Sequence, residues 1–314
     1  MTETVSGIIS LLLILGVVGG LVYWSKRAEH DRSAYVGLFL VFGAPGVLLS
    51  VAGLALSVNG YIAGPLVMGI GLAFALPLLR PVRVALARVT PLDPASPIDM
   101  SGLAMILAVM AFSSLQLTIS SEGGESATNV TGSVTISALI INVVTFAAIA
   151  YVCVGYRIWR NGHEATTRLG LAWPTLRTAL IALALVIPSF ILSMIGSALT
   201  VAFQPNVVEN LQETMDQMTT GVQNPLGAIL LGLSTGVGEE LLFRGAIQPR
   251  FGIVIASLCW VLLHVQYDFT FVLVGLFGIG ILLGLERKYL GTTAAIITHG
   301  VYNVAVVLLQ TYLS

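Results

Sequence analysis

Apolar runs of membrane-spanning length follow one another along the whole chain, separated by short polar loops. A helix needs about 20 apolar residues to cross the hydrocarbon core of a bilayer. Runs of this kind lie at 5–24, 36–58, 61–79, 100–118, 134–156, 178–202, 225–248, 252–267, 270–286 and 292–313. The pattern predicts an all-α fold, a polytopic helical bundle with about ten transmembrane helices.

The basic residues indicate the orientation of these helices. Every Lys and Arg except Arg244 lies in an alternate loop, after the first, third, fifth, seventh or ninth run. Cytoplasmic loops of membrane proteins carry an excess of Lys and Arg. The distribution therefore predicts a multi-pass protein of the cell membrane with both termini external.

Composition supports the same class of protein. Hydrophobic residues make up 56% of the 314 positions and charged residues 9%, with a net charge of −1. Soluble domains carry about 25% charged residues, and nucleic-acid-binding proteins add a basic face. We therefore expect membrane lipid and no nucleic acid among the partners. Cys153 and Cys259 both lie within apolar runs, where we expect them to pack as small side chains.

Ionisable and amide side chains within the apolar runs are candidates for chemistry, because such groups are costly in hydrocarbon and often mark functional sites. They are Glu239, Glu240, Arg244, His264, His299 and Asn303. With a helical rise of about 1.5 Å per residue, the residues of the three runs reach similar depths, about 16–20 Å from the cytoplasmic loops. This common depth predicts one site near the middle of the bilayer.

Helical spacing assigns faces to these residues. Glu240 and Arg244 are four residues apart and can pair, whereas Glu239 is rotated by about 100° and faces elsewhere. His299 and Asn303 share a second face. Gly232 and Gly236 are small residues four apart, and they allow close packing of helices. They lie just before the two neighbouring glutamates at 239 and 240, the acidic pair.

Three short motifs occur in order on successive runs. They are Gly238-Glu239-Glu240-Leu241-Leu242-Phe243-Arg244-Gly245, Trp260-Val261-Leu262-Leu263-His264 and His299-Gly300-Val301-Tyr302-Asn303. Together they resemble the Glu-Glu-x-x-x-Arg, aromatic-x-x-x-His and His-x-x-x-Asn motifs of the CPBP intramembrane proteases, which include the type II CAAX prenyl endopeptidases and the Abi proteins. The motifs lie in 225–313, so we expect a CPBP-like core at 99–314 and an N-terminal transmembrane extension of about three helices at 1–98.

The resemblance implies an intramembrane endopeptidase that cleaves a membrane-associated or prenylated, CAAX-type protein. It assigns the base that activates water to Glu239 and implies that His264 holds this water. His299 and Asn303 would polarise the scissile carbonyl, which agrees with the hydrogen bonds their side chains can donate. Glu240 and Arg244 would support the site as an ion pair. This mechanism needs no metal or other cofactor.

Other interpretations remain open from the sequence. Glu and two His residues are also plausible zinc ligands, which would make the site a metalloprotease. Buried Glu, Arg and His residues also suit a proton-coupled transporter, and a non-catalytic scaffold is a further alternative. Asn142 lies by itself in the fifth run, where we expect it to form an interhelical hydrogen bond.

Overall fold

The computed structural model describes residues 2–121 and 133–313. The described chain is helical almost throughout and contains no β-strand, only an isolated bridge between Tyr156 and Arg160. The all-α prediction is therefore confirmed. Contacts divide the chain into unit 1, formed by Met1–Gly19, Val130–Pro249 and Thr270–Ser314, and unit 2, formed by Gly20–Asn129 and Arg250–Phe269.

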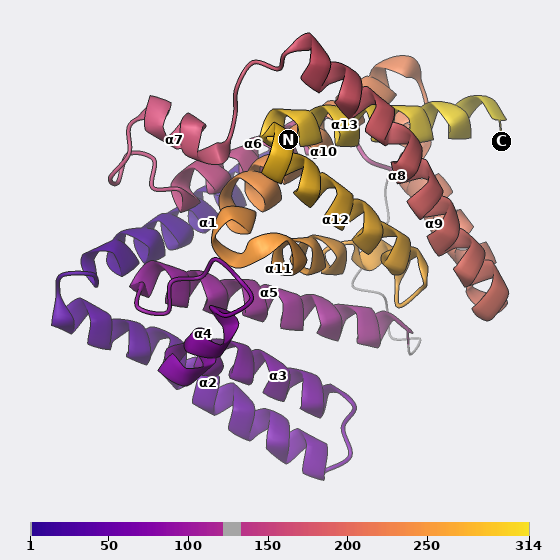
Figure 1. The fold of residues 1–314 in the computed structure, drawn as a ribbon. Coiled ribbons are helices and arrows are strands. Elements are labelled where there is room, and N and C mark those ends of the chain that lie inside the picture. Colours follow the sequence, from indigo (N-terminus) through magenta and orange to yellow (C-terminus); the bar gives the residue numbers. More distant parts are fainter. Residues whose placement is uncertain (1, 122–132, 314) are drawn as a thin grey trace. The chain divides into compact units, whose positions relative to one another are not determined.

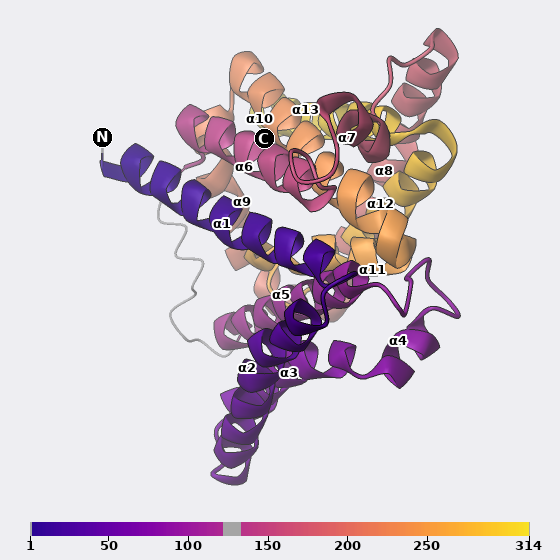
Figure 2. The same ribbon diagram turned by 90° about the vertical axis from the view of Figure 1, so that its left-hand side faces the viewer.

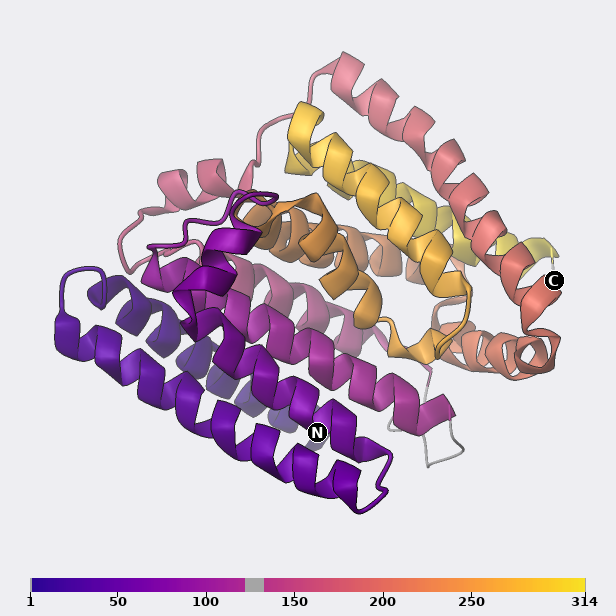
Figure 3. The same cartoon turned by 60° about the horizontal axis from the view of Figure 1, so that its bottom comes forward.

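Unit 1 contains the long helices that carry the acidic pair and the third motif (Figure 1). Its elements are the first part of α1 (Thr2–Arg27), α6 (Ile136–Cys153), α7 (Gly162–Leu169), α8 (Leu176–Phe203), η2 (Pro205–Val207), α9 (Val208–Thr219), η3 (Thr220–Val222), α10 (Pro225–Glu240), the π-helix η4 (Leu241–Ile247), α12 (Val272–Leu290) and α13 (Thr292–Leu313). Helix α10 packs against both α13 and α6, and α6 is seen beside it in Figure 2. Helix α8 packs along α12, as Figure 3 shows, and also contacts α13.

Glycines bring the backbones of α10 and α13 together. A Cβ atom at Gly232 would lie 2.5 Å from the carbonyl oxygen of Gly300, and one at Gly236 would lie 2.9 Å from the Gly300 Cα. Lipid tails are as apolar as leucine, so helices associate in a bilayer largely through close packing of this kind. The spacing of small residues therefore correctly predicted a close helix contact directly before the acidic pair.

Unit 2 is built around a hairpin of two long helices. Its elements are the last part of α1, α2 (Arg32–Val58), α3 (Ala63–Ala75), η1 (Leu76–Leu78), α4 (Arg80–Leu86), α5 (Pro97–Ser121), most of α11 (Gln248–Leu262) and η5 (Val265–Tyr267). Helix α3 packs against both α2 and α5. Helix α2 begins after Asp31, whose carboxylate accepts a hydrogen bond from the backbone N–H of Ser33 and caps the helix. Hydrogen bonds from the Ser33 hydroxyl and the Ala34 N–H lower the pKa of Asp31 to about 2.

Seven of the described helices are long and apolar enough to cross a membrane, and a bent pair makes an eighth candidate. That pair is Ala63–Leu78 with Arg80–Leu86, bent by 88°. The sequence-based number of about ten is higher for two reasons. It divides the continuous stretch Pro225–Leu262, which turns at Gly252 with a φ of 84°. It also counts α12, whose C-terminal end is charged. The chain is a multi-pass membrane protein.

The boundary between 98 and 99 separates the predicted extension from the predicted core. The contact-based units cross this boundary, because unit 2 combines the first helices of the chain with α5 and α11. The two units are defined by which residues pack together. The predicted boundary marks where the CPBP-like core begins in the sequence. The boundary therefore stays a prediction.

Candidate active site

The acidic pair lies at the junction between α10 and the π-helix η4. Nε of Arg244 is 3.3 Å from Oε2 of Glu240, and both side chains are 0% exposed. The spacing of four residues thus correctly predicted the ion pair. Nη2 of Arg244 also donates a hydrogen bond to the carbonyl oxygen of Gly280 on α12, at 3.2 Å. Arg244 therefore binds both Glu240 and a neighbouring helix.

The π-helix itself was not expected from the sequence, which predicts an α-helix through this segment. Its backbone lies against neighbouring elements: a Cβ at Gly245 would be 2.9 Å from a methyl carbon of Leu169. The carbonyl oxygen of Arg244 accepts a hydrogen bond from Nε of Arg287, at 3.2 Å. Single π-turns within α-helices frequently occur at functional sites.

Glu240 also binds a histidine of the third motif. Nδ1 of His299 lies 2.9 Å from Oε1 of Glu240, and the His299 side chain is 4% exposed. Because a carboxylate accepts hydrogen bonds, the proton in this contact belongs to Nδ1, and Nε2 carries a hydrogen only when the ring is protonated. Glu240 therefore fixes the orientation of the His299 ring as well as that of Arg244.

Asn303 contacts α10 about one turn before the acidic pair. Its Nδ2 donates a hydrogen bond to the hydroxyl of Thr235 at 2.8 Å, and that hydroxyl donates to the carbonyl oxygen of Leu231 at 2.9 Å. Thr235 is one helical turn before Glu239, so the two residues share a face of α10. The sequence analysis did not identify Thr235, although its spacing of four from Glu239 was a usable signal.

The two neighbouring glutamates occupy different environments. Glu240 is fully buried between Arg244 and His299, whereas Glu239 is half-buried and faces the side of α10 that carries Thr235. Different environments give neighbouring carboxylates different chemical roles. In unit 1, the structure thus brings Glu240, Arg244 and His299 together, and it directs Asn303 to the face that carries Glu239.

His264 belongs to unit 2 and follows the end of α11. The sequence placed it within a helical run at 252–267, and this is wrong, because the helix ends at Leu262 and His264 has a non-helical ψ of 53°. Its Nδ1 lies 2.9 Å from the carbonyl oxygen of Trp260. A carbonyl only accepts, so Nδ1 carries the proton, and in the neutral ring Nε2 is a hydrogen-bond acceptor.

Comparison with known proteins identifies the region that contains these residues. Residues 221–305 match the Rce1-like family model, whose description is "type II CAAX prenyl endopeptidase Rce1-like". These residues form an Rce1-like segment of the chain. All three sequence motifs lie within the matched segment, so the resemblance to the CPBP proteases is confirmed. No curated protein and no solved structure matches the chain.

The match over residues 221–305 to a protease family supports an endopeptidase, and that family implies a membrane-associated protein as substrate. Zinc was the alternative to a metal-free site. Within 2–121 and 133–313, no three His, Cys, Asp or Glu side chains are grouped as ligands for a metal ion. Whether the site holds a metal stays a prediction.

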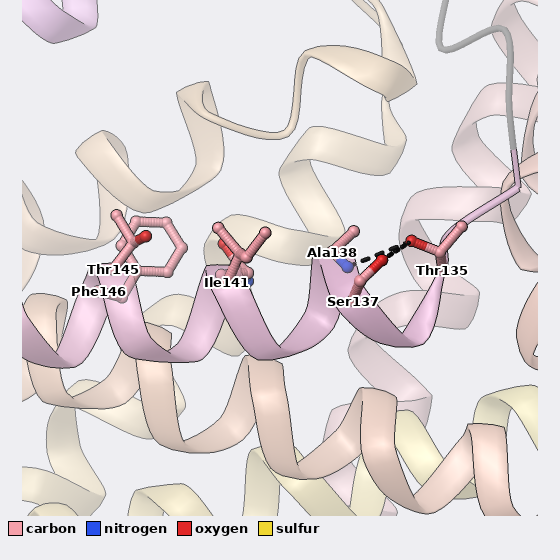
Figure 4. Close-up of a pocket in the computed structure, with 7 residues that line it drawn as sticks. Thr135, Ser137, Ala138, Ile141, Thr145 and Phe146 are labelled. Carbon is pink, nitrogen blue, oxygen red and sulfur yellow. Dashed lines mark hydrogen bonds between the residues drawn. The ribbon is translucent and has the colours of Figure 1, made fainter. Parts of the chain in front are cut away.

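A cavity of about 360 Å³ runs along α6 in unit 1 (Figure 4). It is lined by Thr135, Ser137, Ala138, Ile141, Asn142, Thr145 and Phe146. The ring of Phe146 packs on Phe243 of η4 with 6.4 Å between centroids, next to the acidic pair. Within the described chain Asn142 makes no hydrogen bond, so its expected interhelical bond is absent and the residue lines this cavity instead.

Proposed function

We propose that the Rce1-like segment hydrolyses a peptide bond of a membrane-associated protein with water activated by Glu239. The observation that carries the proposal is the difference in environment between the two glutamates. Glu240 is fully buried and bound to Arg244 and His299, whereas Glu239 is half-buried on a different helix face. A general base has to reach a water molecule, and of the two glutamates only Glu239 is partly exposed.

The proposed reaction consists of two proton transfers, the formation of one carbon–oxygen bond and the cleavage of one carbon–nitrogen bond. Glu239 takes a proton from water, and the resulting hydroxide attacks the scissile carbonyl carbon. The carbon–nitrogen bond then breaks, and the proton held by Glu239 passes to the leaving amine. In this scheme Nε2 of His264 accepts a hydrogen bond from the attacking water, because Nδ1 of the same ring donates to Trp260.

The oxyanion is stabilised by His299 and Asn303 in this proposal. Nδ2 of Asn303 carries two hydrogens. One binds the hydroxyl of Thr235, and the other lies in the plane of the same amide group and donates to the oxyanion in this proposal. His299 donates from Nε2 when its ring is protonated, because Nδ1 is bound to the Glu240 carboxylate. Donors placed before the reaction stabilise the developing charge without reorganisation.

The family indicates the general class of the substrate, a membrane-associated protein. We propose a prenylated CAAX-type protein as the first candidate and another membrane-associated protein as the second. The match to an endopeptidase family supports a protease over the proton-coupled transporter and the non-catalytic scaffold.

A cleavage assay in liposomes tests both the reaction and the substrate. The purified protein is incubated with a farnesylated CAAX peptide, the same peptide without the lipid, and an unrelated transmembrane peptide. Glu239→Gln should lower the cleavage rate by about 10²–10⁴-fold while the protein stays folded. The matched control is Glu213→Gln, which changes an exposed acid on α9 and should cleave at the wild-type rate. Wild-type cleavage by Glu239→Gln would disprove the assignment of the base. Loss of activity in a chelator, restored by zinc, would disprove the metal-free mechanism.

A further inference from the structure

Besides Glu240, a second buried glutamate lies near the candidate site and has no role in the proposed mechanism. Glu286 on α12 is 3% exposed. Its Oε1 lies 2.6 Å from Oγ1 of Thr298, the residue directly before His299. In the described chain Oε2 of Glu286 makes no hydrogen bond, and no Lys, Arg or His forms an ion pair with the carboxyl group.

The hydroxyl of Thr298 has a second contact. Oγ1 also lies 2.9 Å from the carbonyl oxygen of Ala182 on α8. A hydroxyl carries one proton and can donate to only one of these two oxygens. The Ala182 carbonyl can only accept, so the contact with Ala182 is a hydrogen bond only if Thr298 donates its proton there. The short contact with Glu286 is then a hydrogen bond only if the proton between the two oxygens belongs to Glu286.

The surroundings of Glu286 favour the same protonation state. Glu240 is a charged group that acts on Glu286, and Arg244 and His299 both bind Glu240. Glu240 repels a second negative charge at Glu286. Arg287, its neighbour in sequence, donates Nε to the carbonyl oxygen of Arg244. An ionised carboxylate buried with a bare oxygen and no cation is far more costly than the neutral acid.

We propose that Glu286 is a protonated carboxylic acid that donates a hydrogen bond to Thr298 and thereby positions His299. This chain of hydrogen bonds joins α12, α13 and α8 at the turn that directs Nδ1 of His299 to Glu240. Glu286 is a positioning residue, because it acts on the site through Thr298. The positioning role rests on the proposed function, whereas the protonation state does not.

Infrared spectroscopy tests the protonation state without any substrate. At neutral pH, the difference spectrum between the wild type and Glu286→Gln should contain the C=O stretching band of a protonated carboxyl group, and the band should shift in D₂O. Glu209→Gln, a change of an exposed acid on α9, should not remove that band. Absence of the band from the wild-type difference spectrum would overturn the proposal, even for a protein that cleaves none of the peptides.

Cleavage assays test the positioning role. Glu286→Gln keeps a neutral donor and should cleave within about twofold of the wild type, with an unchanged pH profile. Glu286→Leu removes the donor and should lower the rate roughly tenfold, as expected for the loss of a buried hydrogen bond. Since Glu286→Leu can also impair folding, Thr298→Ser and Thr298→Val provide a second pair: the serine should retain activity and the valine should lose it. Wild-type rates in both Glu286→Leu and Thr298→Val would overturn the positioning role.

Discussion

Nδ1 of His299 lies 2.9 Å from Oε1 of Glu240, the same carboxylate whose other oxygen pairs with Arg244. One glutamate therefore orients groups from two helices, since Arg244 follows it on η4 and His299 lies on α13. Because Glu240 orients both groups, it can be required for activity without taking part in the proposed reaction itself. Any change that leaves Glu240 with only one of its partners should affect both stability and activity.

The first prediction concerns Arg244. Replacement by Leu leaves Glu240 buried without its guanidinium partner, which should cost about 3–5 kcal/mol of stability and lower the yield of folded protein. Thermal unfolding in detergent measures the effect. The control is Arg177→Leu, a change of an exposed arginine at the start of α8 that should leave the unfolding temperature unchanged. The double variant Glu240→Leu/Arg244→Leu should recover part of the stability, but not the activity. An Arg244→Leu protein as stable as the wild type would contradict the role of this pair.

The second prediction concerns the glycines between α10 and α13. Gly232→Ala and Gly236→Ala each introduce a Cβ within 3 Å of Gly300 backbone atoms, so the helices have to move apart. Overpacking of this kind should cost about 1–3 kcal/mol and lower the unfolding temperature. Gly69→Ala in α3 is the control, because nothing lies within 4 Å of its Cβ position. If the three variants unfold at the same temperature, close packing at Gly300 is not important for stability.

The third prediction concerns Asn303 and its partner Thr235. Asn303→Ala removes a proposed oxyanion donor and should lower kcat by about 10²–10³-fold without abolishing cleavage. Thr235→Val keeps the side-chain shape but removes the hydroxyl that holds the amide, and a loss of roughly fivefold is expected. Measurement of kcat and KM for both variants separates the two effects. An Asn303→Ala enzyme with a wild-type kcat would show that this amide does not stabilise the transition state.

The fourth prediction concerns orientation. If both termini are external, a single cysteine at Thr167 on α7 should face the cytoplasm, and one at Gln217 on α9 should face outward. Both positions are exposed. After replacement of Cys153 and Cys259, an impermeant thiol reagent applied to intact cells should label only the Gln217→Cys protein. The opposite labelling pattern would invert the predicted topology.

The sequence predicted the long helices well because their apolar runs are bounded by polar loops, as in α2 and α8. It also predicted the contact between Glu240 and Arg244, which depends only on spacing within one helix. The end of α11 was missed because the apolar run continues beyond Leu262 and hydropathy does not change there. The contact between Glu240 and His299 was missed for a different reason: it depends on the rotation of α10 and α13 about their axes, which only packing determines.

The π-helix shows the same limit. An α-helix and a π-helix place Arg244 at different angles relative to Glu240, and the residue types from 241 to 247 do not distinguish the two. The tertiary contacts of Arg244 with Gly280 and of Gly245 with Leu169 were not available to sequence reasoning. Site residues can therefore be recognised from their order and spacing before their partners are known.

The order of α10 and α13 along the chain has a consequence for biosynthesis. Helix α13 supplies His299 and Asn303 and packs on α10, about 60 residues earlier in the chain. Transmembrane helices insert first and associate afterwards. A nascent chain from which α13 has not yet emerged would contain the acidic pair but not the groups proposed to polarise the substrate carbonyl. Insertion of α13 would thus be required before proteolysis can begin, which would protect neighbouring membrane proteins from a half-made enzyme.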